Sequence, residues 1–385
     1  MTGWKDTRPS SLNPQTRFKS PPDPSILSRL HDAHCHPTDD DDFQPEKLQE
    51  LKTGKFCVMS SSLTNQEKTK RVYEARPDDV IPCFGLHPWF SHPISFSPAD
   101  SLPSKESHYT LLFPSVDSPS EPHPSLSLLL PYLPPPVSIS TFLSSLSSDL
   151  ALYPSSFIGE LGLDKSFKIP HPPPLLSSHP SPLHKNSDLS TPIEHQVRVV
   201  EAQVELAIKM RRNVSQHCVR CTGETVELLK RFKREKEGFE SIYVCLHSFG
   251  GSAEAAKQIQ KKHSNIFFSF STIISGRSPN FFKLLQAIEP ERLLLESDFS
   301  DTTQIDLQIW EIFEAICEAR SWTPEETVQI LERNWRRFTQ PAEERPEMGK
   351  KKSGKQKKRE KRQVDLYVSE DDNEGDEGKI QENGV

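Results

Sequence analysis

Residues 28–36 read SRLHDAHCH, a short run of apolar and small residues that ends in a polar cluster. Seven later runs have the same form: KFCVMSSS (55–62), VIPCFGLHP (80–88), SSFIGELGLD (155–164), NVSQHCVR (213–220), SIYVCLHSF (241–249), NIFFSFS (265–271) and RLLLESD (292–298). Runs of this length and composition are typical of strands that are buried on both faces, as in a parallel sheet. The sequence therefore predicts eight strands.

Segments with helical spacing of apolar residues separate most of these runs. They cover residues 64–76, 193–212, 223–236, 252–263, 278–288, 304–320 and 323–338. Ser252 is placed to cap one helix, and Thr323 with Pro324 forms the N-cap and first-turn pair of another. Alternation of strands and helices indicates a parallel α/β fold. Eight units favour a (β/α)8 barrel over an open sheet.

Polar, proline-rich and charged stretches interrupt or flank this pattern. We expect a disordered leader over residues 1–27, a barrel over 28–340, and a charged tail over 341–385. Two Pro/Ser-rich insertions are expected at about 91–150 and 165–192, because dense proline suits neither helix interiors nor central strands. Within the first, LSLLLPYL and STFLSSLSSDLALY could form short packed helices. The tail is basic and then acidic, which suits a solvated segment, a nuclear localisation signal or a nucleic-acid patch.

Composition limits the partners and the compartment. The net charge of −7 gives no overall attraction to nucleic acid, so any such attraction must be local. Seven scattered cysteines indicate a reduced protein rather than a disulfide framework. The N-terminal stretch has no apolar secretion signal, and no run of about 18 apolar residues is present. We expect a cytoplasmic or nuclear protein that does not bind membranes.

Potential metal ligands stand at the ends of five predicted strands. His34 and His36 are two residues apart, so on a strand their side chains point to the same face. The other candidates are Glu160, His217, His247 and Asp298, each at the end of a later run. Carboxyl ends of barrel strands are where such folds build active sites. The alternative is that these polar residues only cap their strands.

Six ligands exceed what one tetrahedral ion needs, so we predict two divalent ions, with Mg²⁺, Mn²⁺ or Zn²⁺ as candidates. Glu160 is the predicted bridge, with His34, His36 and Asp298 on one ion and His217 and His247 on the other. Two metals acidify a bound water and clamp the reacting oxygens. Asp298 is the predicted proton acceptor.

The five motifs that carry these residues, together with a sixth that contains His87, resemble those of the TatD-type deoxyribonucleases. The matching stretches are DAHCHPTD (32–39), CFGLHPW (83–89), IGELGLD (158–164), QHCVR (216–220), LHSFGG (246–251) and LLESDFS (294–300). The resemblance implies a TIM barrel, two divalent metals, and hydrolysis of phosphodiester bonds in DNA. It carries over the same six ligands, with Glu160 and Asp298 as catalytic groups, and it assigns His87 to a substrate phosphate.

The sequence departs from the family pattern beside the predicted ligands. An extra residue separates His217 from Arg220, which is the candidate for a second substrate contact, and Trp89 replaces a family histidine. Phe299 and Ser300 replace the family's small residue and proline. These changes affect substrate contacts rather than metal ligands. The insertions and tail resemble a fungal branch whose members are described as partners of a cell-cycle ubiquitin-ligase subunit, which implies a possible protein partner.

Three functions remain open from the sequence: a DNA phosphodiesterase, a hydrolase of a small ester or amide, and a scaffold that keeps the barrel for protein binding.

Two acidic residues close in sequence to the predicted metal ligands are expected to have supporting roles. Asp164 is expected to orient a loop, and Glu296 to hold the barrel end together or to support a ligand.

Overall fold

The computed structural model describes residues 21–40, 43–115, 118, 121–179 and 183–341. Its central sheet has eight parallel strands in the order β1-β2-β3-β6-β7-β8-β9-β10. Their bounds are β1 His31–Cys35, β2 Lys55–Met59, β3 Val80–Phe84, β6 Phe157–Asp164, β7 Val214–Val219, β8 Val244–Leu246, β9 Ile266–Phe270 and β10 Leu293–Leu295. All eight predicted strands are present, and the (β/α)8 barrel prediction is confirmed.

Hydrogen bonds beyond the end of β10 connect it to β1. The Asp298 N–H donates to the His34 carbonyl at 2.9 Å, and the His36 N–H donates to the Phe299 carbonyl at 2.9 Å. The Asp32 carboxylate also accepts from the Ser297 N–H at 3.0 Å. These bonds draw the last strand against the first at the end where the candidate ligands lie.

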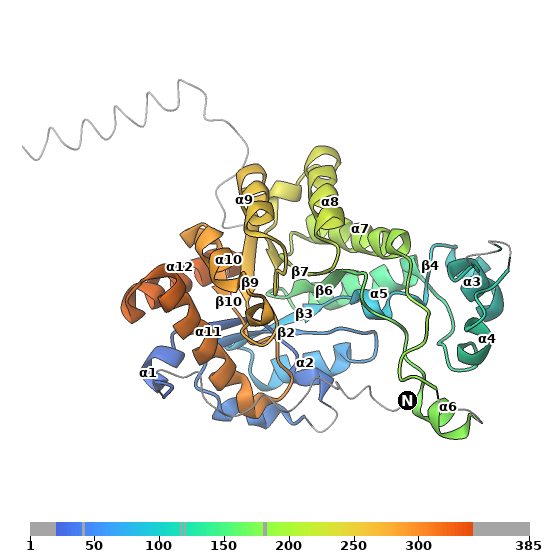
Figure 1. The fold of residues 1–385 in the computed structure, drawn as a ribbon, viewed down its shortest axis with the longest axis horizontal. Helices are drawn as coiled ribbons and strands as arrows, with labels where there is room; N and C mark the ends of the chain where they lie inside the picture. The colour runs from blue at the N-terminus through green and yellow to red at the C-terminus, as the bar shows by residue number, and fades with distance from the viewer. Residues whose placement is uncertain (1–20, 41–42, 116–117, 119–120, 180–182, 342–385) are drawn as a thin grey trace, which may run out of the picture. The chain divides into compact units, whose positions relative to one another are not determined.

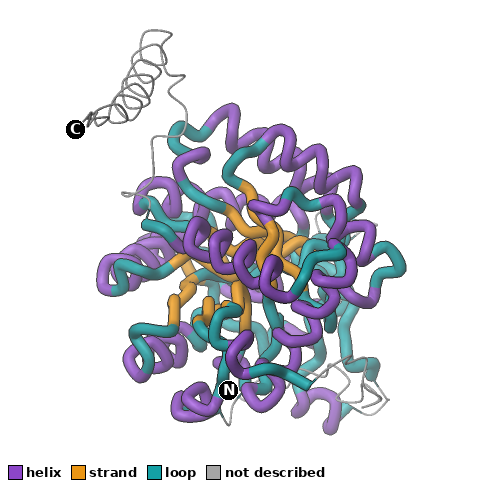
Figure 2. Tube along the Cα trace, turned by 90° about the vertical axis from the view of Figure 1, so that its left-hand side faces the viewer, coloured by secondary structure: helices purple, strands orange, loops and turns teal. Residues whose placement is uncertain are grey.

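Helices lie around the strands, which occupy the middle of the molecule in Figure 2. The helices of the described residues are α1 Pro24–Leu27, α2 Gln66–Ala75, α3 Lys105–Leu112, α4 Leu126–Leu129, α5 Ile139–Leu152, α6 Pro173–Ser178, α7 Ile193–Met210, α8 Thr222–Glu235, α9 Ala253–Lys262, α10 Phe281–Ala287, α11 Ile305–Arg320 and α12 Pro324–Thr339. Both predicted caps are confirmed. Ser252 caps α9, and Thr323 forms a reciprocal capping box with Glu326 at the start of α12.

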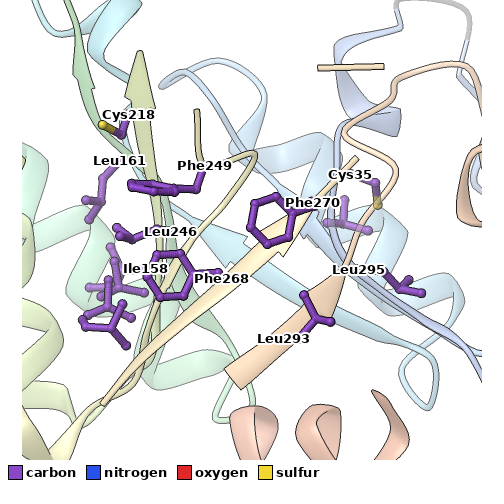
Figure 3. Packing of buried hydrophobic residues seen from close by; sticks show 14 of the residues in the cluster. Cys35, Ile158, Leu161, Cys218, Leu246, Phe249, Phe268, Phe270, Leu293 and Leu295 are labelled. Carbon is purple, nitrogen blue, oxygen red and sulfur yellow. The ribbon is translucent and has the colours of Figure 1, made fainter. Parts of the chain in front are cut away.

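Strand alternation divides the buried side chains into two sets. Leu161, Leu246, Phe268 and Leu295 point outward and join one hydrophobic cluster with the surrounding helices (Figure 3). Residues next to them in sequence point to the barrel axis, and many of these are polar. The outward set holds the helices on the barrel, which leaves the inward set free to form a site.

The two proline-rich insertions pack against each other. The short strands β4 Ile94–Ser95 and β5 Val137–Ser138 pair in parallel, so residues 96–136 form an excursion from their base. A separate hydrophobic cluster joins this excursion to residues 165–191: Tyr109, Leu112, Phe113, Leu126, Leu129 and Leu133 pack with Ile169, Leu175 and Leu189. We call the described residues of 96–136 and 165–191 the accessory lobe; α3, α4 and α6 lie on the same side of the barrel (Figure 1).

Two boundaries differ in detail from the expected ones. The stretch 91–150 includes most of α5, which packs against β3 and α7 as a helix of the outer ring. The leader over 1–27 includes α1, whose Leu27 is buried in the main core. The leader before residue 21 and the tail after residue 341 lie outside the described residues. Among the residues described, no helix combines the length and apolar character of a membrane span.

Candidate metal centre

The candidate ligands meet at the carboxyl ends of the barrel strands. Alternation along β1 turns Asp32, His34 and His36 to the barrel interior, while Cys35 between them joins the outer core. Register places Gly162 of β6 beside His217 of β7. A Cβ at Gly162 would lie 2.2 Å from the His217 carbonyl oxygen, so only glycine allows β7 to approach this closely.

Glu160 lies at the centre of the cluster, and its two oxygens face different histidines. Oε2 is 3.2 Å from His36 Nε2 and 3.6 Å from His34 Nε2. Oε1 is 2.8 Å from His217 Nδ1 and 2.7 Å from His247 Nε2. The carboxylate therefore spans two groups of imidazole nitrogens.

Asp298 lies close to His36 and His247. Its Oδ1 is 3.7 Å from His36 Nε2, and its Oδ2 is 3.9 Å from His247 Nδ1. The His34 and His247 rings stack with centroids 3.7 Å apart and planes 5° apart. All six residues that the sequence singled out as ligands thus lie together, and all are buried.

The donor set is suited to divalent ions. Three overlapping sets have ligand atoms that all lie within 4.8 Å of one another: His34, His36 and Glu160; His34, His247 and Asp298; and His87, Glu160 and His217. Imidazole nitrogens mixed with carboxylate oxygens bind Zn²⁺, Mn²⁺ and related ions.

A second layer of residues fixes the histidine rings. His34 Nδ1 is 2.8 Å from Ser215 Oγ, His36 Nδ1 is 3.3 Å from Asp39 Oδ2, and His217 Nε2 is 3.3 Å from Asp164 Oδ2. In each of these three rings, the nitrogen that is not held by this partner faces Glu160. Such partners set the tautomer and orientation of metal-binding histidines.

The electrostatics of the cluster favour a bound positive charge. Burial opposes ionisation of Glu160, but the imidazoles of His87, His247 and His34 outweigh burial and hold its pKa well below the ordinary value. Burial also opposes the charged form of His217, but Asp164 and Glu160 raise its pKa to about 10. Burial, together with the neighbouring His247, lowers the pKa of His34 to about 3 against the opposing effect of Glu160, so this ring is neutral, as a ligand must be.

The two predicted substrate contacts have different positions. His87 Nε2 lies 3.3 Å from Glu160 Oε1, and its Nδ1 accepts a hydrogen bond from the Trp89 N–H at 3.1 Å. In the neutral ring the proton therefore sits on Nε2, which makes His87 a donor toward the cluster. Arg220 is exposed at the bend that follows β7, whereas the six candidate ligands are buried.

Two buried acids have more contacts than the sequence indicated. Asp32 accepts from Ser297 and from the His34 N–H at 3.0 Å, and burial raises its pKa to about 7. Glu296 accepts from Ser269 and from the Ser248 N–H at 2.7 Å, which supports the loop after β8. Sequence reasoning missed Asp32, although its place two residues before His34 was a usable signal.

A (β/α)8 barrel with clustered histidines and carboxylates at its carboxyl end defines the class of metal-dependent hydrolases. Comparison with known proteins specifies the family. The family model described as "TatD related DNase" matches residues 31–340, so the chain belongs to the TatD-related DNase family. The prediction of a metal-dependent hydrolase is thereby confirmed.

Individual relatives agree with this assignment. The Cut9-interacting protein scn1 of Schizosaccharomyces pombe is 34% identical over 342 residues, which cover 81% of this chain and 99% of that protein. An uncharacterized deoxyribonuclease of Saccharomyces cerevisiae is 27% identical and covers 71% of this chain and 84% of its own length. A crystal structure of a TatD homologue from Escherichia coli superposes with a TM-score of 0.53 at 18% identity, covering 81% of this chain and 98% of that one.

Proposed function

We propose that this protein is a deoxyribonuclease that cleaves phosphodiester bonds with two divalent metal ions. The observation that carries the proposal is the position of Glu160, whose two oxygens face separate sets of nitrogens. A carboxylate in that position can bridge two ions. The family assignment supports nucleic acid as the substrate class.

Each side chain has a defined part in this proposal. His34, His36 and Asp298 would hold one ion, His217 and His247 the other, with Glu160 between them. When bound, the ions supply an acidified water and a clamp for the phosphate oxygens. Asp298 would accept the proton from that water, with its Oδ2 held at 2.9 Å by the Ser248 hydroxyl. His87 and the exposed Arg220 would donate to substrate phosphate oxygens.

The test is cleavage of labelled DNA by the purified chain with added Mg²⁺ or Mn²⁺, and its suppression by EDTA. Asp298→Asn should lower kcat by about 100- to 10,000-fold, the usual contribution of a positioned proton acceptor. Glu160→Gln should lower kcat at least as much and reduce the number of bound metal ions. Glu50→Gln makes the same chemical change at an exposed position and should leave the rate unchanged.

Circular dichroism should show that all three variants remain folded. Equal cleavage by wild type, Glu160→Gln and Asp298→Asn would show that the proposed site does not perform the reaction. Cleavage that persists in EDTA after removal of bound ions would contradict the role of the metals.

A protein-binding role is a second candidate, favoured by one relative and one surface. That relative, matched over 99% of its length, is described as Cut9-interacting. On the accessory lobe Leu111 is 80% exposed and Tyr132 is 46% exposed. Co-precipitation with the Cut9 counterpart from the same organism should be lost in Leu111→Lys and retained in Glu160→Gln. Retention in both variants would place the partner elsewhere on the chain.

A further inference from the structure

An aromatic pair, of which Trp89 is exposed and Phe167 partly buried, lies beside the metal centre. Trp89 follows His87 by two residues, and 39% of its surface is exposed. Its ring stacks on Phe167, with centroids 4.8 Å apart and planes 13° apart. The His87 ring lies 4.8 Å from the Trp89 ring at a steep angle. The His87 side chain therefore lies between this exposed indole and Glu160.

Asp164 holds the pair in place and ties it to the centre. Its Oδ2 accepts from Trp89 Nε1 at 2.7 Å and lies 3.3 Å from His217 Nε2. Its Oδ1 accepts from the Phe167 N–H at 3.1 Å and from the Ser166 N–H at 2.6 Å. The indole is thus fixed in one orientation at both its ring nitrogen and its stacked face.

The accessory lobe backs the same pair. Phe167 is partly buried against the lobe's hydrophobic cluster, which includes Tyr109, Ile169 and Leu189. The lobe thereby supports an aromatic wall at the carboxyl end of the barrel. A large exposed aromatic surface that is rigidly held has little conformational entropy to lose when a flat ligand stacks on it.

Two cationic residues directly follow the neighbouring strands β6 and β7. Lys165 follows β6 and Arg220 follows β7, and the Lys165 N–H donates to the Val219 carbonyl at 3.1 Å. Lys165 pairs with Glu224 on α8, while Arg220 is exposed. Positive charge next to an aromatic surface is the pattern that proteins use for a sugar-phosphate backbone with unstacked bases.

We propose that Trp89 and Phe167 form a stacking subsite for an unpaired nucleobase next to the phosphate that is cleaved. This inference rests on the proposed nuclease function and specifies its substrate: a strand whose bases are free to stack. A base inside a duplex has both faces covered by its neighbours and would first have to be unstacked. The subsite selects single-stranded segments or frayed ends.

Binding of two single-stranded oligonucleotides tests the subsite. One carries normal bases and the other has the same backbone with abasic residues. Fluorescence anisotropy on the Asp298→Asn protein with Mn²⁺ measures binding without relying on cleavage. Stacking predicts that the normal strand binds about 5- to 100-fold more tightly than the abasic strand. Trp89→Ala should remove most of that preference.

Trp89→Phe is the matched control, because it keeps an aromatic face but loses the bond to Asp164. It should keep most of the preference for bases. An unchanged preference in Trp89→Ala would overturn the proposal. Equal weakening of both strands in Trp89→Ala would also overturn it, because it would show only a structural role.

The two proposals fail in different ways. Absence of cleavage by the wild-type protein with Mg²⁺ or Mn²⁺ would refute the nuclease function, whatever the binding data show. Cleavage by the wild type together with no base preference would leave the nuclease function intact and refute the subsite.

Discussion

Asp164→Asn should weaken metal binding although Asp164 is not a predicted ligand. To bind an ion through Nδ1, His217 must carry its proton on Nε2, where Asp164 accepts it at 3.3 Å. An asparagine would keep Oδ1 for Ser166 and Phe167 but place an NH₂ group toward His217. That group donates rather than accepts, so the favoured tautomer would carry its proton on Nδ1, toward Glu160.

The size of the effect follows from these contacts. Loss of a residue that orients a metal-binding histidine lowers affinity by about 10- to 100-fold, or about 1.4 to 2.8 kcal/mol. The Trp89 indole N–H would also lose its acceptor, because the same NH₂ group would replace Asp164 Oδ2. Because Trp89 is partly exposed, water can replace the acceptor that its indole loses, so the loss of this one bond costs only about 1 kcal/mol.

Calorimetric titration with Mn²⁺ measures the affinity, and urea unfolding of the metal-free protein measures the stability. Trp89→Phe is the control, since it removes the indole donor but leaves the Asp164 carboxylate toward His217. It should bind Mn²⁺ as the wild type does. Wild-type affinity in Asp164→Asn would refute the tautomer argument, and equal weakening in Trp89→Phe would attribute the effect to the indole.

Two further predictions concern stability. Gly162→Ala should lower the free energy of unfolding by about 3 kcal/mol or more, because its Cβ would lie 2.2 Å from the His217 carbonyl oxygen. Gly223→Ala is the control, because a Cβ there meets nothing within 4 Å, and it should cause no such loss. Equal urea midpoints for the two variants would contradict this reasoning. Burial lowers the pKa of His92 to about 4, so the unfolded chain binds its proton first as the pH falls. The stability that neutral His92 provides is complete above about pH 6.5 and is lost as the pH falls toward 4. His92→Gln should therefore lose less stability than the wild type between pH 7.5 and pH 4.5, and equal losses would show that His92 is not responsible.

The barrel and the cluster could be predicted because both depend on short-range sequence patterns. A strand that is buried on both faces needs an apolar run. A polar residue directly after such a run lies at the carboxyl edge of the sheet. That reasoning located His34, Glu160 and Asp298 without knowledge of any contact between them. It could also have located Asp32, which shares the inward face of β1 with His34.

The residues that connect the cluster to its surroundings depend on contacts that sequence patterns do not encode. Asp164 was expected only to orient a loop, yet it also contacts His217 and Trp89 from two other strand ends. Trp89 was interpreted as a departure from the family pattern, and its partner Phe167 lies 78 positions further along the chain. Only the fold brings these side chains together.

The accessory lobe shows why proline-rich segments resist prediction. Dense proline predicts an absence of regular structure, and the described residues of the lobe form only the short helices α3, α4 and α6 and a 3-10 turn at Ala99–Ser101. Proline also restricts the unfolded chain, so such a segment loses less conformational entropy when it is held in one conformation. A few buried side chains, such as Tyr109, Leu129 and Leu189, can then hold two distant segments together. If that packing positions Phe167, Tyr109→Ala should reduce the preference for bases over abasic strands while leaving Mn²⁺ affinity unchanged, and an unchanged preference would separate the lobe from substrate recognition.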